Sequence, residues 1–242
     1  MIFLELVPRD SQQTIDESIQ SLQTYSQLSG INIPDIKQLQ HRSYNMVDML
    51  LDHNIDALPH LRTKDKSVSD YVTIVERLIQ KGLKKILLVS GDSHQDAVYE
   101  TSPIELTKTL KNKFPQLTVY SAIDPYRQSF EDELDYAKKK LAAGTDGFFT
   151  QPFFDIELVD KYLKEFSQTQ LFIGISPVLS QKSYEYWVSV NKVAFPASFE
   201  LNLKYNCELG KLILSKITHY NQHAYIMPIK IDLFNYLDQL LK

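Results

Sequence analysis

The fold is decided by the stretch Gly144-Thr-Asp-Gly-Phe-Phe-Thr-Gln-Pro-Phe-Phe-Asp155. It opens with a glycine where a helix should stop, continues as an apolar strand, and ends in the uncharged hydrogen-bonding pair Thr150 and Gln151. The same order recurs along the chain: a short apolar strand, a polar residue at its carboxyl end, then a helical segment. Parallel strands ringed by helices bring their carboxyl ends together at one mouth, where the catalytic residues of such barrels collect. The pattern therefore predicts a site at that mouth.

Eight strand candidates alternate with amphipathic helices along the 242 residues. Alternation favours a parallel sheet, and a count of eight favours closure over a doubly wound sheet. We therefore predict the α/β class and an eight-stranded parallel (β/α)8 TIM barrel, formed as one domain over residues 1–242. The expected strands lie near residues 2–6, 31–34, 57–61, 85–90, 117–122, 147–151, 170–175 and 223–228. The expected helices cover 14–28, 43–52, 67–81, 103–113, 130–143, 155–166, 182–191, 208–220 and 231–241.

Composition limits the class of protein. The apolar fraction of 43% and the charged fraction of 23% are ordinary for a globular chain with a sizeable core. A net charge of −4 gives no basic footprint for nucleic acid, so a small-molecule ligand is the better expectation. A single cysteine, Cys207, excludes an internal disulfide and argues against a thiolate metal site. With no signal-peptide pattern and no membrane-length apolar run, we expect a cytoplasmic protein with no membrane partner.

Several familiar motifs are missing from the sequence. It contains no Gly-x-Gly-x-x-Gly fingerprint and no P-loop, so any nucleotide must bind in another way. It also lacks His-Glu-x-x-His and Gly-x-Ser-x-Gly, the signatures of metalloproteases and serine hydrolases. Glu5, His60 and Asp92 at three strand ends could be imagined as a metal triad, but their position alone is weak support, and we predict no metal.

Glu5 is an isolated carboxyl near the end of an apolar strand. Burial beside the barrel interior should raise its pKa from about 4.3 towards 6–7, the range that suits a general acid near neutrality. The alternation of side chains in a strand leaves open that Glu5 points outward against the helices. Its place at the strand end favours the mouth.

Asp92 follows Gly91 at the end of the fourth expected strand. A glycine there lets the backbone approach a ligand, and the carboxylate can accept hydrogen bonds from ring N–H groups. A capping role for Asp92 in the next turn is equally consistent with the sequence.

The expected helix over 130–143 carries Glu133, Tyr136, Lys139 and Lys140, whose spacings of three and four place them along one face. A pair of cations there could hold a diphosphate. A solvated run of charge is the commoner meaning of Lys138-Lys-Lys140, and the residues alone leave both readings open.

Six segments carry a resemblance to a known family. They are Leu4-Glu5-Leu-Val-Pro8, Pro59-His60-Leu-Arg62, Leu88-Val-Ser-Gly-Asp92, Ala143 to Asp155, Gly174-Ile-Ser-Pro-Val178 and His223-Ala-Tyr-Ile-Met227. In order and spacing they are similar to the methylenetetrahydrofolate reductases, over nearly the whole chain.

The resemblance implies a barrel that holds FAD at its mouth without a Rossmann fold. It implies that NADH or NADPH reduces the flavin, which then reduces 5,10-methylenetetrahydrofolate to 5-methyltetrahydrofolate. By motif, Glu5 matches the acid that protonates folate N10, Asp92 the carboxylate between flavin and pterin, and Gln151 the amide that orients folate and nicotinamide. The flavin-contacting positions are His60, Gly91, Asp92, Tyr120, Asp124, Glu133, Tyr136, Lys139 and Lys140; the substrate-contacting positions are Gln151, Phe153 and Gln181.

Four places depart from the family pattern. Ile31-Asn-Ile-Pro-Asp35 replaces a Val-Thr-Tyr-Gly-Ala-Gly-Gly run, Asp124 replaces a histidine, Gln181 replaces a stacking aromatic residue, and Met227-Pro-Ile-Lys230 replaces a Thr-Leu-Asn segment. These differences indicate a compact, divergent branch.

Two other functions stay open from the sequence. One is a flavin-independent folate reductase with direct hydride transfer from nicotinamide. The other is a folate- or flavin-binding accessory subunit of a methyl-transfer system. As partners, a homo-oligomer or a methyltransferase is expected.

Overall fold

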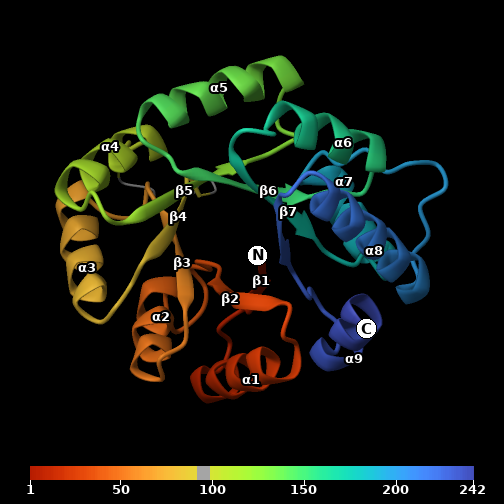
Figure 1. The fold of residues 1–242 in the computed structure, drawn as a ribbon, viewed down its shortest axis with the longest axis horizontal. Helices are drawn as coiled ribbons and strands as arrows, with labels where there is room; N and C mark the ends of the chain where they lie inside the picture. Colours follow the sequence, from red (N-terminus) through yellow and green to blue (C-terminus); the bar gives the residue numbers. More distant parts are fainter. Residues whose placement is uncertain (92–98) are drawn as a thin grey trace.

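Eight strands close into a barrel in sequence order, and every neighbouring pair is parallel, including β1 against β8 (Figure 1). The arrangement comes from a computed structural model, in which residues 1–91 and 99–242 are described. The strands are β1 (Ile2–Glu5), β2 (Leu28–Ile33), β3 (Ala57–Arg62), β4 (Lys85–Val89), β5 (Thr118–Ile123), β6 (Gly147–Pro152), β7 (Gln170–Ile175) and β8 (His223–Ile226). The predicted eight-stranded parallel barrel is confirmed.

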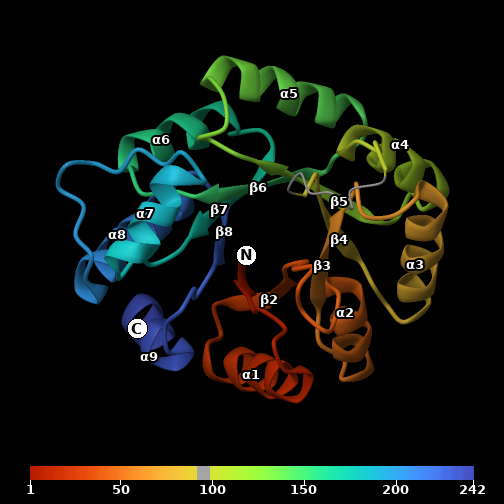
Figure 2. The same ribbon diagram turned by 180° about the vertical axis from the view of Figure 1, so that it is seen from behind.

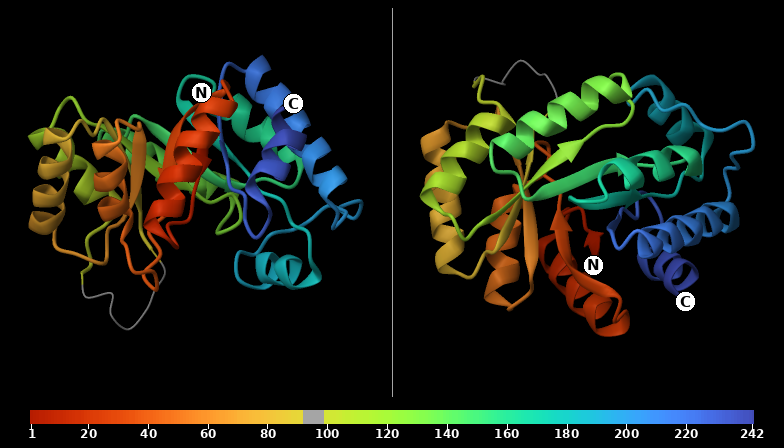
Figure 3. Two further views of the ribbon diagram at one scale, coloured as in Figure 1. Left: turned by 90° about the horizontal axis from the view of Figure 1, so that it is seen from below. Right: turned by 45° about the horizontal axis from the view of Figure 1, so that its top comes forward.

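Helices surround the barrel on its outside, as both faces of the ribbon show (Figures 1 and 2). They are α1 (Ser11–Thr24), α2 (Ser43–Asp52), α3 (Val68–Gln80), α4 (Pro103–Lys113), α5 (Phe130–Ala142), α6 (Ile156–Glu165), α7 (Gln181–Ser189), α8 (Leu203–His219) and α9 (Leu233–Leu241). In the left view of Figure 3, α7 lies apart from the other helices, below them.

Capping side chains explain why two helices, α1 and α8, begin several residues earlier than predicted. Asp10 accepts a hydrogen bond from the backbone N–H of Gln13 at 2.8 Å, so α1 begins at Ser11. Asn202 does the same for Tyr205 at 2.8 Å, so α8 begins at Leu203 and not near 208. The prediction was also wrong at the end of α1, because Leu28 already belongs to β2.

The core of the barrel has two layers. The outer layer lies between the strands and the helix ring, where the aliphatic faces of both elements meet. The inner layer fills the barrel itself and consists of Phe3, Leu58, Leu87, Tyr120, Phe149, Phe172, Tyr225 and Met227. Within it the Phe149 and Phe172 rings stack with centroids 4.2 Å apart and planes at 9°. The barrel is therefore solid at its centre and open only towards its ends.

Strand alternation then fixes which side chains reach the mouth. Phe3 and Phe149 point into the barrel interior, so Glu5 and Gln151, two residues further along the same strands, point inward as well. Among the residues that the structure describes, no helix has the length and apolar character needed to cross a bilayer.

Candidate functional site

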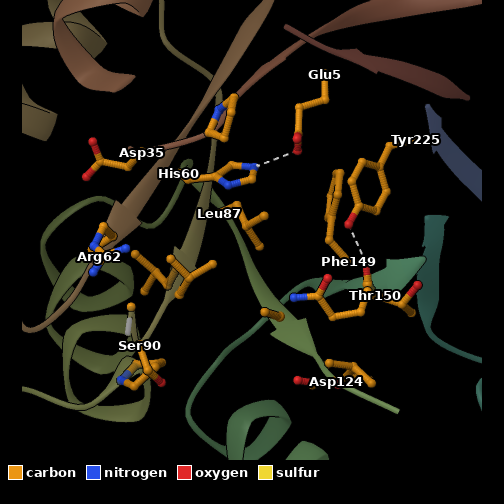
Figure 4. A pocket seen from close by; sticks show the side chains of 18 of the residues that line it. Glu5, Asp35, His60, Arg62, Leu87, Ser90, Asp124, Phe149, Thr150 and Tyr225 are labelled. Atoms are coloured by element: carbon orange, nitrogen blue, oxygen red, sulfur yellow. Dashed lines mark hydrogen bonds and ion pairs between the residues drawn. The ribbon is translucent and has the colours of Figure 1, made fainter. Parts of the chain in front are cut away.

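A cavity of about 430 Å³ opens at the carboxyl ends of the strands, a size typical of small-molecule sites (Figure 4). Its walls come from strands distant in sequence: Glu5 on β1, His60 on β3, Gln151 on β6 and Tyr225 on β8. Leu87 and Phe149, the upper members of the inner core, also line it. The fold therefore gathers an acid, an imidazole, an amide and a phenol around one space.

Glu5 is a buried acid, with 8% of its surface exposed. Loss of water around the carboxyl raises its pKa to about 8, because burial disfavours the charged form. The carboxyl is thus protonated at neutral pH. The open question of its direction is resolved by the cavity wall, to which Glu5 belongs.

His60 and Asn32 stand beside Glu5. The His60 Nε2 atom is 2.8 Å from Asn32 Oδ1, while Asn32 Nδ2 donates to Glu5 Oε2 at 3.4 Å. The direct separation of His60 Nε2 and Glu5 Oε2 is 3.9 Å, which is longer than a hydrogen bond. Burial lowers the pKa of His60 to about 3, so the imidazole is neutral at pH 7.

The end of β6 is held from both sides. The Thr150 hydroxyl accepts a hydrogen bond from the Gly174 N–H at 3.0 Å, and the Tyr225 hydroxyl donates to the Thr150 carbonyl. A Cβ atom at Gly174 would meet the backbone of Gln151 and Pro152 at 3.0–3.1 Å, so glycine lets the two strands approach. Within the described chain the Gln151 side-chain amide makes no hydrogen bond to protein, and it lines the cavity.

The structure separates the two lysines that were expected on one helix face. Lys140 is 3% exposed, lines the cavity and donates from Nζ to the Ala122 carbonyl at 2.5 Å. Burial lowers the pKa of Lys140 to about 8, and its Nζ lies 4.1 Å from the centre of the Tyr136 ring. Lys139 is exposed, because consecutive helix residues differ by about 100° in direction.

Glu133 is buried and organises the loop after β5. Its Oε2 accepts from Arg127 at 2.8 Å and from Gln128 at 2.6 Å, and its Oε1 accepts from the Asp124 N–H at 3.2 Å. Arg127 and Asp124 are thereby held on the cavity wall, whereas Glu133 itself lies behind it. Burial raises the pKa of the Asp124 carboxyl.

Besides Glu133, Tyr136 and Lys139 on α5, three further sequence-predicted residues do not line the cavity. Tyr120 belongs to the inner core, and its hydroxyl donates at 3.0 Å to Gln170, the first residue of β7 and so at the opposite end of the barrel. The Phe153 ring packs on Tyr162 of α6 with centroids 5.3 Å apart. Gln181 is exposed at the start of α7 and donates to Glu185 at 3.0 Å.

Of the two site residues predicted at the end of the fourth strand, Gly91 and Asp92, only Gly91 is among the described residues. Gly91 lines the cavity with a φ of 78°, a conformation that favours glycine. A Cβ atom there would lie 3.0 Å from the Arg62 guanidinium. Asp92 lies outside the described residues.

Sequence reasoning missed a charged network at the rim. The Arg42 guanidinium binds Asp35 from Nε at 2.7 Å and Asp65 from Nη2 at 2.7 Å, and Arg62 Nε lies 3.2 Å from Asp65. Asp35 and Arg62 both line the cavity. The signal was present, since Arg62 ends the His60 strand and Asp35 follows β2. Arg62 was considered only as part of a segment that carries the resemblance, and Asp35 only as part of one that departs from it.

A second cavity of about 580 Å³ adjoins the first and shares Glu5 and Met227 with it. It lies between the start of α1 and the segment that joins β8 to α9, and it carries the cations Arg9 and Lys230. Within residues 1–91 and 99–242, no three His, Cys, Asp or Glu side chains are grouped so as to hold a metal ion.

Comparison of the sequence with known proteins gives a consistent result. The family model described as methylenetetrahydrofolate reductase matches residues 34–208. The 5,10-methylenetetrahydrofolate reductase of Buchnera aphidicola subsp. Schizaphis graminum is 26% identical over 174 residues, which cover 67% of this chain and 60% of that protein. The Escherichia coli (strain K12) protein of the same name is 24% identical over 165 residues, which cover 64% of this chain and 56% of that protein. The chain thus spans less than two thirds of the length of these relatives.

Solved structures share the barrel. A 2,3-dimethylmalate lyase, of the PEP mutase/isocitrate lyase superfamily, superposes with a TM-score of 0.62 at 8% identity, covering 95% of this chain and 76% of that chain. The Yersinia pestis DHPS with a pterine-sulfa conjugate superposes with a TM-score of 0.55 at 11% identity, covering 99% of this chain and 90% of that chain. At these identities the likeness concerns the fold alone.

Proposed function

The chain belongs to the methylenetetrahydrofolate reductase family, and from this premise we propose that it is a flavin-dependent oxidoreductase. The proposed reaction reduces 5,10-methylenetetrahydrofolate to 5-methyltetrahydrofolate with electrons from NADH or NADPH. The observation that carries the proposal is Glu5, a carboxyl protonated at neutral pH on the wall of a cavity of ligand size.

The residues of the cavity fit FAD as the cofactor. Arg127 and the buried Lys140 supply positive charge for a diphosphate, and Gly91 lets the backbone approach a flat ring. His60, neutral and mostly buried, offers a hydrogen-bonding edge rather than a charge. When bound, FAD supplies the hydride chemistry that links the nicotinamide donor to the folate.

Glu5 provides the proton that the folate step requires. At pH 7 its carboxyl lies below its pKa of about 8 and can donate to N10 of the substrate. As the N10–H bond forms, the bond from N10 to the methylene carbon breaks and its electron pair stays on N10. The remaining N5 iminium carbon is then ready to accept a hydride.

Gln151 is suited to orienting two ligands in turn. Its amide has both a donor and an acceptor, and within the described chain neither is used by protein. The same side chain can therefore bind a carboxamide in one half-reaction and a pterin in the other. The role of Asp92 stays a prediction from the resemblance.

The second cavity gives room for the anionic tail of a folate. Neither Arg9 nor Lys230 has an ion pair within the described chain, while Asp10 and Asp232 each cap a helix.

Changing Arg9 and Lys230 together to glutamine should raise the KM for a polyglutamyl substrate more than that for a monoglutamyl one. Equal KM changes for both substrates would remove the tail from this cavity.

The proposed function is tested by two measurements on the purified chain. The flavin content is read from the absorbance of the protein, and NADH or NADPH oxidation is followed with and without methylenetetrahydrofolate. The expected result is a yellow protein with folate-dependent oxidation. A colourless protein that turns over and ignores added FAD would instead indicate the flavin-independent reductase, and ligand binding without turnover would indicate the accessory subunit.

A further inference from the structure

Asn32 is the link between the acid and the imidazole of the site. It is fully buried on β2, where its side chain lies between β1 and β3. Its Oδ1 is 2.8 Å from His60 Nε2 and its Nδ2 is 3.4 Å from Glu5 Oε2. Since the direct distance from His60 Nε2 to Glu5 Oε2 is 3.9 Å, the amide and not the imidazole contacts the acid by a hydrogen bond.

The chemistry of an amide fixes the direction of each hydrogen bond. A carbonyl oxygen only accepts, so His60 must carry its proton on Nε2 to contact Asn32 Oδ1. The NH₂ group only donates, and in a protonated carboxyl the carbonyl oxygen is a better acceptor than the hydroxyl oxygen, so the amide favours the proton-free oxygen of Glu5 at Oε2. The acidic proton of Glu5 is consequently carried by Oε1. His60 thus determines, through the amide, which carboxyl oxygen is the acid.

Other groups around Glu5 do not take this role. Tyr225 on β8 faces the acid, but its hydroxyl is donated to the Thr150 carbonyl. Asp35 on the cavity wall is bound by Arg42. In the described part of the chain, Asn32 is the one side chain that donates a hydrogen bond to Glu5.

The remaining charged groups of the wall face other partners. Asp124 on the far wall accepts from the Tyr126 N–H at 3.0 Å. Arg62 lies against Asp65, and Lys140 donates to the Ala122 carbonyl.

We propose that Asn32, oriented by His60, is a positioning residue that holds Glu5 Oε2 as an acceptor and directs the acidic proton to Oε1. When the Oε1–H bond breaks, the proton goes to the substrate nitrogen and the electron pair stays on the carboxylate. The Asn32 N–H then stabilises that carboxylate. Only the identity of the proton acceptor rests on the proposed function. The orientation of the acid does not.

The first test is the tautomer of His60 in the unmodified protein. Nitrogen-15 NMR of labelled histidine at pH 7 should show a neutral ring protonated at Nε2. The resonance is assigned with a His60→Gln variant. A ring protonated at Nδ1 would mean that the amide is turned the other way, with its oxygen towards Glu5, and would overturn the proposal.

The second test is the titration of Glu5, followed by the infrared carboxyl band of glutamate-labelled protein and assigned with Glu5→Gln. Asn32→Leu keeps the branched shape of the side chain and removes the donor, so the Glu5 pKa should rise by about one unit, which is 1.36 kcal/mol. Ser121→Ala is the matched control, because it removes another buried hydrogen bond, the one between the Ser121 and Thr145 hydroxyl groups at 2.9 Å on β5 and beside β6. This change should leave the carboxyl band of Glu5 unchanged. An unchanged Glu5 titration in folded Asn32→Leu would overturn the proposal.

His60→Phe covers the case in which Asn32→Leu does not fold. It keeps a ring in place but frees the amide to turn, so the Glu5 titration should again change, and no change would count against the role of His60.

In the enzyme assay, Asn32→Leu should lower kcat for folate reduction by roughly tenfold with little change in KM, and should move the alkaline limb of the pH profile to higher pH. Neither the NMR nor the infrared measurement needs folate, so the two proposals can fail separately. If the Glu5 titration shifts as expected in Asn32→Leu but the unmodified protein does not reduce folate, the proposed reaction is wrong and the positioning role of Asn32 holds. If the unmodified protein reduces folate but the Glu5 titration is unchanged in Asn32→Leu, the proposed reaction holds and the positioning role is wrong.

Discussion

At the scale of single residues, burial shifts the pKa values of two neighbouring groups, Glu5 and His60, in opposite directions. The Glu5 pKa is raised to about 8 and the His60 pKa is lowered to about 3, because each group loses water and each favours its neutral form. A neutral acid beside a neutral imidazole avoids a buried ion pair, which would need further hydrogen bonds to be stable. The site therefore holds a proton ready at neutral pH.

The two shifts predict how stability depends on pH. Glu5 has a folded pKa of about 8 and a reference value of 4.5, so the folded state binds its proton more tightly and stability falls as the pH rises from 4.5 to 8. His60 has a folded pKa of about 3 and a reference value of 6.5, so its contribution to stability rises as the pH rises from about 3 to 6.5. Between pH 4.5 and 6.5 the two effects oppose each other. Urea unfolding from pH 4 to 9 should show a maximum near that interval.

Glu5→Gln should remove the alkaline loss of stability. At pH 9 the variant should be more stable than the unmodified protein, by at most roughly 5 kcal/mol at 1.36 kcal/mol per pKa unit, and at about pH 4, below both pKa values, the two should be alike. Parallel curves of unfolding free energy against pH for the two proteins would show that Glu5 titrates normally.

The same substitution separates the two half-reactions. As the proposed acid, Glu5 serves only the folate step, so Glu5→Gln should lower folate reduction by roughly 10²- to 10⁴-fold. Oxidation of nicotinamide by an artificial acceptor should stay near its original rate. Glu157→Gln, on the exposed first turn of α6, is the matched control. Equal losses in both half-reactions would take the acid role from Glu5.

At the scale of elements, the rotation of α5 decides which of its charges serves the site. Lys140 faces the cavity beside the Tyr136 ring, whereas Lys139 faces solvent. Glu133, on the same helix, accepts a hydrogen bond from Arg127 and so fixes the loop that carries Arg127. One helix thus supplies a charge directly and places a second through a buried carboxylate.

Flavin retention should distinguish the two lysines. Lys140→Met keeps the buried stem and removes the charge, and it should raise the Kd for FAD by roughly 10- to 100-fold, the range expected for one charge-assisted contact. Lys139→Met should leave the Kd within about twofold, as expected for an exposed charge. Fluorescence titration of the flavin-free protein measures both. A similar loss for the two variants would restore the idea of a shared lysine pair.

The contrast shows what sequence could and could not predict. The strand and helix order followed from periodicity and capping, and Glu5, His60 and Gln151 were found because strand ends of a parallel barrel must meet. The sequence did not predict which way Lys139, Tyr120 and Phe153 point. Side-chain direction depends on the rotation of each helix or strand about its axis, and a shift of one residue turns a side chain away from the cavity. The contact of Asn32 with His60 joins two strands, and no local pattern in the sequence encodes it.

At the scale of the whole molecule, close approach between strands keeps the barrel in register. A Cβ atom at Gly147 on β6 would lie 2.6 Å from the Gln170 carbonyl oxygen of β7, and one at Gly30 on β2 would lie 2.9 Å from the Asp56 carbonyl oxygen. Both obstacles are backbone and cannot turn aside. These glycines therefore set how near neighbouring strands come in the amino-terminal part of the barrel.

Gly147→Ala tests this control of strand spacing. Overpacking against backbone should cost about 1–3 kcal/mol, and each 1 kcal/mol lowers Tm by about 2–4 °C in a chain of this size. Gly82→Ala is the comparison, because its Cβ would meet nothing within 4 Å, although its φ of 101° carries strain. Gly147→Ala should lower Tm more than Gly82→Ala in calorimetry. Equal Tm losses for the two variants would show that the close approach at Gly147 does not limit the spacing of β6 and β7.

The aromatic rings beneath the cavity bear on how Glu5 would regain a proton in the proposed reaction. Phe3, Phe149 and Phe172 pack against one another inside the barrel, whereas Glu5 lines both cavities at the carboxyl ends of the strands. This packing favours reprotonation of the carboxyl from the cavity side. Substrate would enter from the same side, so we expect product release to precede reprotonation of Glu5.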